Sequence, residues 1–540
     1  MTAPDDAPAR RRAPAAADGQ WHRVHPLTPA VKSWQVLVFV LVFLAQDYGQ
    51  QAFRGGFGDE GGGDGGFDVG RIGTGLLAGG SAVIALVVLV AVGFAVLSWR
   101  MTRYRLTAEA LELHQGVLSR RQRAARLDRL QAVDVVQPLV ARIFGLARLN
   151  LEVAGAGDSK IELAYLTHEQ AQSLRGHLLA RAAGVVYETD EAPQAPEHHV
   201  FELPLQRLFG SLLLSGAFAT AVVAALAFVA FGVVSVLVGN GDLGPFAAGG
   251  IPLLLGVGGV LWGRFSNGFG FRVATSPDGV RLRHGLLEQR TQTVPPGRVQ
   301  AVRLSQPLLW RGVDWWNVRV NVAGYGGGSG EQSGESETTL LPVADRREAL
   351  TVLAMVVPDL GVVPPEHPVA VVEAALSGSG TASGFVTSPR SARWLDPLAW
   401  RRTGYRATDQ VLLVRRGRLT RQVDVVPHAR TQSLGVRQGP VQRRLGLATF
   451  AVHSTPGPVS PVVAHLSSAA AAVLLAEQAG RSRVARLAAG PERWMDVAGS
   501  ISPAAGSPSA ATDPPGTDPP ATDPPAAGPA PDARPPAATS

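Results

Sequence analysis

Arginine is the residue type that carries most of the possible chemistry in this chain. The sequence has 50 lysines and arginines, of which only Lys32 and Lys160 are lysines, and it has no cysteine. A guanidinium group stays charged near neutral pH and can hold a phosphate through two parallel hydrogen bonds. Arginine at a repeated position is therefore a candidate for an anion-binding site or for pairing with a carboxylate of the chain. The absence of cysteine excludes disulfides, iron–sulfur clusters, thiolate zinc sites and cysteine nucleophiles.

Two sets of arginines fit such a site. The first set stands at one position of a repeated frame, and its members could bind a phosphate or pair with a carboxylate such as Asp134. The second set has no acidic neighbours, and alternate positions on a hairpin would place some of it against an anionic leaflet, at about 1 kcal/mol per cation. The candidates for binding an anion, a lipid or a partner are Arg129, Arg298 and Arg430 in the first set, and Arg415, Arg416 and Arg418, followed by Arg421, in the second.

The sequence predicts no catalytic, cofactor-binding or metal-binding constellation. The twelve histidines form no His-Glu-x-x-His pattern, and His198–His199 lies in a polar linker. His22 and His25 stand three residues apart, but no carboxylate is near them in sequence to complete a metal site. The chain also lacks the Gly-x-x-x-x-Gly-Lys pattern that cradles phosphates. We therefore expect a protein that is not an enzyme and that needs no cofactor.

The residue frame that contains the first set occurs three times. In each copy a Gly is followed by Gln after 15 residues, by a second Gln after six more and by Arg after another five. The copies are Gly116–Gln131–Gln137–Arg142, Gly285–Gln300–Gln306–Arg311 and Gly417–Gln432–Gln438–Arg443. Chance does not keep three spacings identical in three places, so the chain contains three copies of one small domain. We expect the glycines to serve turns and the first glutamines to be buried against backbone groups.

The elements of one copy follow from its hydrophobic pattern. Arg103–Thr107 and Ala110–His114 alternate apolar and polar residues, as half-buried strands do. Thr167 with Gln170 forms a capping box before an apolar helical stripe, and helices near 345–356 and 467–478 end the other two copies. Each copy is therefore expected to be an antiparallel barrel or sandwich closed by a C-terminal helix.

Four apolar runs predict transmembrane helices. They cover about 31–45, 72–97, 208–238 and 245–262. Cations flank their outer ends, whereas the loops that join each pair are poor in cations, so the positive-inside rule places both termini and all three copies in the cytoplasm. A cleaved signal peptide is a competing interpretation of the first run, but no small-residue cleavage site follows it. The runs contain no buried acid or base, which disfavours an ion-coupled transporter.

Several short motifs resemble a known family. They are His25–Pro26–Leu27–Thr28–Pro29 before the first run, Tyr104–Arg105–Leu106–Thr107 after the second, Arg129–Leu130–Gln131–Ala132–Val133–Asp134, and Gln137–Pro138–Leu139. Together with the alternation of helix pairs and small domains, they resemble the bacterial PH-domain (bPH2) membrane proteins of the YdbT type. The resemblance implies a PH-like barrel, but it implies no particular activity because the family has no agreed one. The second copy departs from the pattern, with Asp314 where the first has Gly145.

The predicted fold class is therefore an α+β membrane protein with three PH-like antiparallel β-barrel or sandwich domains, each closed by a C-terminal helix, and about four transmembrane helices. The predicted parts are an N-terminal segment (1–30), transmembrane pair 1 (31–99), PH-like domain 1 (100–183), a linker (184–207), transmembrane pair 2 (208–264), PH-like domain 2 (265–360), a flexible linker (361–398), PH-like domain 3 (399–480) and a Pro/Ala-rich disordered tail (481–540).

These parts predict a multi-pass scaffold in the cell membrane. Its cytoplasmic domains would bind anionic lipid headgroups or another membrane protein. The alternative is a transport or export factor, or one that confers tolerance to membrane-active compounds. The sequence disfavours nucleic acid as a partner. The third copy is basic, with nine arginines and two aspartates over 403–466, but it lacks the basic–aromatic interleaving of a single-strand platform.

Overall fold

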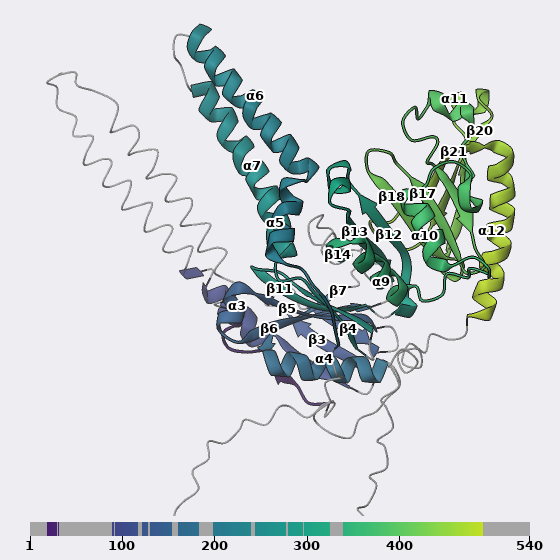
Figure 1. The fold of residues 1–540 in the computed structure, drawn as a ribbon. Coiled ribbons are helices and arrows are strands. Elements are labelled where there is room, and N and C mark those ends of the chain that lie inside the picture. The colour runs from purple at the N-terminus through teal and green to yellow at the C-terminus, as the bar shows by residue number, and fades with distance from the viewer. Residues whose placement is uncertain are drawn as a thin grey trace, which may run out of the picture. The chain divides into compact units, whose positions relative to one another are not determined.

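The computed structural model describes residues 19–29, 31, 89–90, 92–107, 109–116, 121–127, 130–153, 160–182, 198–238, 244–276, 279–294, 296–323 and 338–489. Figure 1 shows their helices and strands, which form antiparallel sheets in all three repeats. Most of the predicted spans 31–45 and 72–97, and the tail from residue 490, lie outside the described residues.

The first repeat has two groups of three strands and a closing helix. The elements are β2 (Arg103–Leu106), β3 (Ala110–Gln115), β4 (Arg121–Arg126), β5 (Leu130–Pro138), the short helix α3 (Leu139–Ile143), β6 (Leu146–Val153), β7 (Lys160–Thr167) and α4 (His168–Ala182). The expected capping box opens α4, since the amide of Gln170 donates to Thr167 Oγ1 (3.3 Å) and Gln170 Oε1 accepts from the Thr167 amide (3.4 Å).

The other two repeats have the same element order. The second contains β9 (Arg272–Ser276), β10 (Gly279–His284), β11 (Glu288–Val294), β12 (Val299–Gln306), the 3₁₀ helix η3 (Leu308–Gly312) in place of a short α-helix, β13 (Trp315–Val322), β14 (Thr339–Asp345) and α9 (Arg346–Val356). The third contains β16 (Gly404–Ala407), β17 (Val411–Arg416), β18 (Arg421–Pro427), β19 (Ser433–Arg437), the short helix α11 (Pro440–Arg444), β20 (Leu447–His453), β21 (Val462–Ser467) and α12 (Ser468–Ala488). Antiparallel strands followed by a C-terminal helix are thus confirmed in every repeat.

Consecutive repeats share their sheets. One seven-stranded sheet has the order β7-β6-β5-β11-β10-β9-β8, and the other has the order β14-β13-β12-β18-β17-β16-β15. The second half of each repeat is thus continued by the first half of the next, through the antiparallel pairs β5–β11 and β12–β18. Strands on both sides of the second junction, such as those carrying Leu304 and Val425, also contribute to one hydrophobic core. The repeats are therefore joined by backbone hydrogen bonds as well as by the chain itself.

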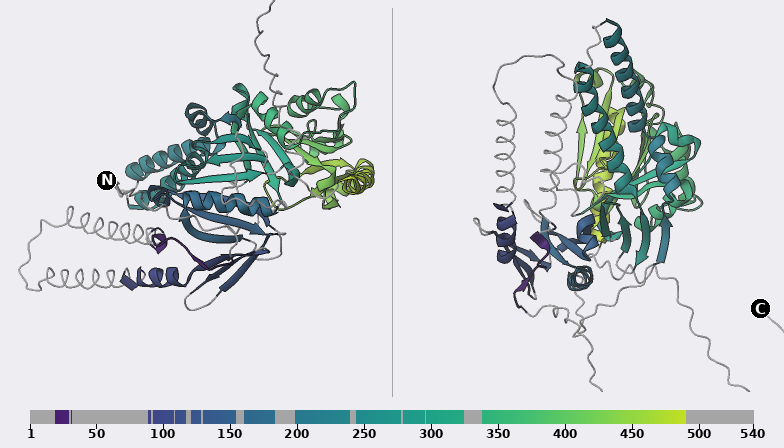
Figure 2. Two further views of the ribbon diagram at one scale, coloured as in Figure 1. Left: turned by 90° about the horizontal axis from the view of Figure 1, so that it is seen from below. Right: turned by 90° about the vertical axis from the view of Figure 1, so that its left-hand side faces the viewer.

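A short extra strand precedes each repeat. These strands are β1 (His22–Arg23), β8 (His198–Glu202) and β15 (Val386–Thr387), which pair with β2, β9 and β16. In the second repeat the chain between β8 and β9 forms α5 (Leu205–Leu213), α6 (Gly216–Val238) and α7 (Gly244–Gly268). Figures 1 and 2 show α6 and α7 running side by side.

The predicted span 208–238 is divided between two helices. The chain leaves α5 at Leu214, and Ser215 caps α6 by accepting a hydrogen bond from the amide of Phe218 (3.1 Å). Among the described helices, only α6 over Gly216–Leu237 has the length and apolarity needed to cross a membrane. Four spans are therefore not confirmed, and the third begins at Gly216 rather than Leu208, because Leu208 is buried in the core.

The segment 361–398, which its Ser/Gly content led us to expect as a flexible linker, instead contains α10 (Pro368–Ser377). The apolar face of this helix is buried, with Val371, Val372, Ala375 and Leu376 in the core. The buried side chain of Arg402 holds its C-terminus by donating to the carbonyls of Ala375 (2.9 Å), Leu376 (2.6 Å) and Gly378 (2.7 Å). Burial of an apolar face outweighs the local flexibility of the Ser/Gly run that follows it.

Candidate anion-binding site

The repeated arginines lie at the junctions between repeats. Arg298 ends the 3₁₀ turn Pro296–Arg298, and its Nη2 donates to the carbonyl oxygen of Leu130 at the start of β5 (3.1 Å). Arg430 holds the same position in the third repeat, and its Nη2 lies 3.9 Å from a Cβ atom placed on Gly297 of the second repeat. Arg129 lies outside the described residues. Arg298 and Arg430 thus reach back to the preceding repeat, which favours a structural role over an anion contact.

The arginines of the second set do not form one exposed face. Arg415 is fully buried, so its predicted place on a membrane-facing surface is wrong. Its guanidinium donates to the carbonyls of Arg402 (3.1 Å), Ala374 (3.3 Å) and Gly380, and it lies 4.1 Å over the Phe385 ring. Burial lowers the pKa of Arg415 to about 10. The alternation of β17 points this side chain at Ala374, Gly380 and Arg402, the first two of which lie in the segment 361–398 that the sequence predicts to be a flexible linker.

The other two arginines of this set differ in exposure. Arg416 Nη2 lies 3.7 Å from Asp424 Oδ2 and donates to the Ser460 carbonyl (3.4 Å). Arg418 is exposed in the turn between β17 and β18, where its carbonyl accepts a hydrogen bond from Arg311. Arg418 therefore remains accessible to an anion, whereas Arg416 faces a carboxylate.

The glycines and second glutamines of the frame have structural roles. Gly285 (φ +110°) and Gly417 (φ +76°) occupy the left-handed region, and a Cβ atom would lie 2.0 Å from Glu288 O and 2.1 Å from Thr420 O, respectively. These contacts confirm the expected turn role. Gln137 and Gln438 donate to the carbonyl nine residues later, at 3.4 and 2.9 Å, and so connect the ends of two strands.

Asp314 explains how the second repeat departs from the pattern. It has φ +50°, at the position where Gly145 and Gly446 have φ +66° and +63°. Its Oδ1 accepts hydrogen bonds from Gln306 Nε2 (3.0 Å), Trp316 Nε1 (3.0 Å) and Arg346 Nη2 (3.1 Å). Burial alone would raise the pKa of Asp314, but these hydrogen bonds lower it below its usual value. The carboxylate network stabilises a backbone conformation that glycine adopts elsewhere.

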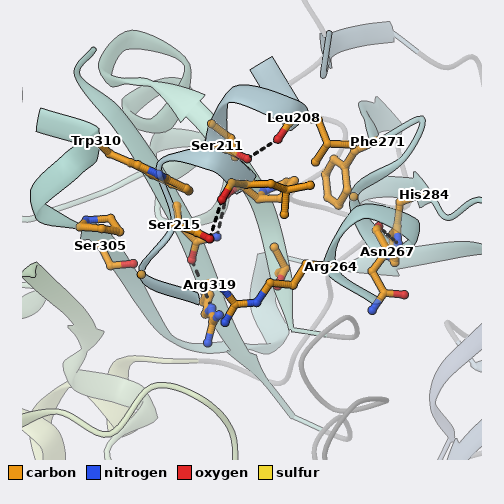
Figure 3. Close-up of a pocket in the computed structure, with 18 residues that line it drawn as sticks. Leu208, Ser211, Ser215, Arg264, Asn267, Phe271, His284, Ser305, Trp310 and Arg319 are labelled. Carbon is orange, nitrogen blue, oxygen red and sulfur yellow. Dashed lines mark hydrogen bonds between the residues drawn. The ribbon is translucent and has the colours of Figure 1, made fainter. Parts of the chain in front are cut away.

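A cavity at the base of the α6–α7 pair offers a better anion site than either arginine set. It has a volume of about 300 Å³ and is bounded by α5, the last turn of α7 and residues of β12, β13 and β14 (Figure 3). Leu208, Phe271 and Trp310 give it apolar walls. Gly216, the first residue of α6, also lines it, so the cavity lies where the apolar helix meets the sheet domain.

Close packing at two glycines brings the helices to the cavity. A Cβ atom on Gly210 of α5 would lie 2.8 Å from the Trp315 ring, and one on Gly268 of α7 would lie 2.6 Å from Leu208 Cδ1. Larger side chains would push α5 and α7 away from the sheet and from each other. The small residues therefore fix the distance between the walls.

Two guanidinium groups line this cavity. Arg264 comes from the end of α7 and Arg319 from β13, and Figure 3 shows both side chains directed to the same part of the cavity. Arg319 Nε donates to Asn317 Oδ1 (3.2 Å), which orients its guanidinium. None of the described lining residues is acidic. Two guanidinium groups set in partly apolar walls suit an anion that carries an apolar group.

His284 closes one side of the cavity as a neutral group. It is buried, its ring stacks on Phe271 at 5.2 Å, and its Nδ1 lies 3.1 Å from the carbonyl oxygen of Asn267. Burial, with a contribution from Arg290, lowers the pKa of His284 to about 4. Its Nε2 has no hydrogen-bond partner among the described residues. At neutral pH the cavity's positive charge therefore comes from Arg264 and Arg319.

Sequence reasoning missed this cavity because its residues come from distant parts of the chain. In the sequence Arg264 is one of the cations that flank the fourth apolar run, and Arg319 lies in an ordinary strand pattern. In the described part of the chain, no group of three or more His, Asp or Glu residues is arranged to hold a metal ion. The described histidines do not add a metal centre to the cavity.

Comparison with known proteins agrees with the repeat structure. The family model for the bacterial PH domain matches residues 57–182, 210–358 and 359–482, together more than half of the chain. UPF0699 transmembrane protein YdbT of Bacillus subtilis (strain 168) is 19% identical over 315 residues, which cover 52% of this chain and 61% of that protein. The chain thus spans about three fifths of the length of this relative. No solved structure matches the chain.

Proposed function

Because the chain belongs to the bacterial PH domain family and is a membrane-associated protein, we propose that it is a multi-pass membrane scaffold that binds anionic lipid headgroups. Its repeats would lie on the cytoplasmic face. The observation that carries this proposal is the cavity at the base of α6 and α7, where Arg264 and Arg319 meet apolar walls.

The place of the cavity supports a lipid rather than a freely diffusing anion. Large apolar side chains on α6 are exposed, including Val223 (66%), Leu226 (64%) and Phe231 (53%). Such a surface is stable when hydrocarbon covers it. A lipid with its tails along α6 would have its headgroup near Gly216, which lines the cavity.

The shared sheets support the scaffold part of the proposal. The pairs β5–β11 and β12–β18 connect the domain that lies next to the cavity with the repeats before and after it. A protein partner of any repeat would thus be held close to the lipid site. Tethering raises the effective concentration of such a partner without new contacts.

Lipid binding by the purified full-length chain tests the proposal. In native mass spectrometry of the detergent-solubilised protein, we expect phosphatidylglycerol to be retained in preference to phosphatidylcholine. The double variant R264Q/R319Q should lose about ten- to 100-fold in affinity for phosphatidylglycerol, because a hydrogen bond to a charged group contributes about 1.5–3 kcal/mol.

The matched control removes two exposed arginines from the third repeat, R437Q/R444Q, which changes the net charge equally. This control should bind phosphatidylglycerol as the wild type does. Equal affinity of wild type and R264Q/R319Q for phosphatidylglycerol would refute the cavity as the lipid site. A wild type that retains both lipids equally would refute charge recognition.

A further inference from the structure

All three repeats carry an insertion at the same place in the sheet. It lies between the extra strand and the first strand of the repeat: between β1 and β2, between β8 and β9, and between β15 and β16. The last two insertions leave the strand pair in the same way. Leu203 N donates to Phe271 O (2.9 Å) in the second repeat, and Ser388 N donates to Thr403 O (3.0 Å) in the third.

The insertion of the third repeat replaces a helix pair with a short segment. In the second repeat Pro204 precedes α5, and the chain then forms α6 and α7 before it returns to the sheet. In the third repeat Pro389 precedes a 3₁₀ helix, Arg390–Trp394, and the chain returns to the sheet at Gly404. The two insertions begin alike, but the segment 388–403 has no counterpart of α6 and α7.

This short segment exposes large apolar side chains. Trp394 is 73% exposed, Leu398 58% and Leu395 37%. The equivalent helix α5, which lies at the foot of the apolar helix α6, exposes Phe209 (53%) and Leu213 (57%) in the same way. Apolar side chains are therefore exposed at equivalent places in the second and third repeats, which indicates that both places contact the same apolar surroundings.

Arginines surround the apolar residues of the segment. Arg390, Arg393 and Arg401 are exposed, and the Arg393 guanidinium lies 5.4 Å from the centre of the Trp394 ring. The one acidic residue, Asp396, accepts a hydrogen bond from the amide of Ala399 (3.1 Å). Tryptophan favours the headgroup zone of a bilayer, and each cation near an anionic leaflet contributes about 1 kcal/mol.

We propose that the segment 388–403 is an interfacial membrane contact, in which Trp394, Leu395 and Leu398 enter the headgroup zone of an anionic leaflet. The segment is too short and too charged to span a bilayer. It would hold the third repeat against the membrane that α6 crosses. The inference requires the chain to be membrane-bound, but it does not require the cavity to bind lipid.

Because the chain has no cysteine, a single introduced thiol can report the position of one residue. Full-length L398C, labelled with an environment-sensitive fluorophore, is reconstituted into vesicles of phosphatidylcholine and phosphatidylglycerol. Quenching is measured with nitroxides on lipid acyl chains and with aqueous iodide. The matched control is L419C, in the β17–β18 turn, where Leu419 is 59% exposed. L226C on α6 reports insertion of the apolar helix.

We expect the label at 398 to be quenched by the lipid nitroxide and protected from iodide, and the label at 419 to show the reverse. Charge reversal in R390E/R393E/R401E should reduce the lipid quenching at 398 several-fold. If the label at 226 is quenched by the lipid nitroxide but the label at 398 is as accessible to iodide as the label at 419, the inference is overturned. That result would not affect the proposal that the cavity binds lipid. Absence of lipid quenching at both 226 and 398 would overturn the membrane span and this inference together.

Discussion

A buried ion pair at the junction of the second and third repeats allows a quantitative test of how the repeats are joined. Asp424 on β18 is fully buried and stands directly opposite Arg303 on β12. Arg303 donates to it through Nε (2.6 Å to Oδ1) and Nη2 (2.9 Å to Oδ2). The two residues belong to different repeats, so the pair stabilises the shared sheet.

The expected cost of breaking the pair follows from the surroundings of Arg303. Removing one partner of a buried pair costs about 3–5 kcal/mol, because the other charge is left without compensation. The Arg303 side chain is 12% exposed, and it also donates to the carbonyls of Pro458 (2.8 Å) and Ser460 (3.2 Å). These remaining hydrogen bonds favour the lower end of that range. D424N should therefore shift the opening equilibrium of the junction by roughly 100-fold, since 1.4 kcal/mol is about tenfold.

Hydrogen exchange of the full-length chain measures this opening. We expect amides of β12 and β18 to exchange roughly 100-fold faster in D424N, while those of β6 and β7 in the first repeat change little. D409N, which alters an exposed aspartate of the same repeat, is the control. The double variant R303M/D424L should regain much of the protection, because it removes both members of the buried pair and the neighbouring Arg416 side chain is 28% exposed. Exchange in β12 and β18 of D424N equal to that of D409N would refute the role of the pair.

Two further predictions concern the turn glycines and the buried histidine. G417A should destabilise the third repeat by about 1–3 kcal/mol in thermal unfolding, because φ is +76° and the new Cβ would meet Thr420 O. The control G480A, in α12, should not destabilise it, since nothing lies within 4 Å of the new Cβ. Equal unfolding temperatures of the two variants would contradict this explanation. The pKa of His284 is lowered from 6.5 to about 4, so the unfolded chain takes up a proton that the folded chain does not as pH falls through this interval. The free energy of unfolding should therefore decrease by up to about 3 kcal/mol as pH falls through this interval. The unfolding temperature of H284Q should fall less over the same interval than that of the wild type.

Local features of the fold could be predicted from the sequence because they depend on neighbouring residues. The capping box at Thr167 and Gln170 and the turn at Gly417 each need only a few consecutive residues, and both are present in the structure. The sharing of sheets could not be predicted in the same way. Strands pair through backbone N–H and C=O groups, which do not depend on the type of side chain. The spacing of side chains therefore does not indicate which strand of another repeat an edge strand pairs with.

The position of a strand in its sheet also determines whether equivalent residues of the repeats are buried or exposed. Gln300 is buried, as expected for the first glutamine of the frame, but Gln432 is exposed. Gln300 lies in β12, which has strands on both sides, whereas Gln432 precedes β19, an edge strand. The expectation of a buried glutamine is therefore confirmed for Gln300 and wrong for Gln432, because no other described strand pairs with the free edge of β19.

The two junctions between repeats pair their strands in the same register. This register predicts which residues would face each other if the free edges of the first and last repeats were paired. Gln137 stands opposite Gln289 in the first junction, and the equivalent residues Gln306 and Arg421 stand opposite each other in the second. In the described part of the chain, β4 of the first repeat and β19 of the last are edge strands of their sheets.

If a second copy continued the array in this register, Arg121 of one molecule would face Arg437 of the other. Like charges directly opposite each other destabilise a sheet, and charged residues on edge strands are a common means of preventing edge-to-edge association. The same pairing that joins the repeats within one molecule is therefore opposed by charge between molecules.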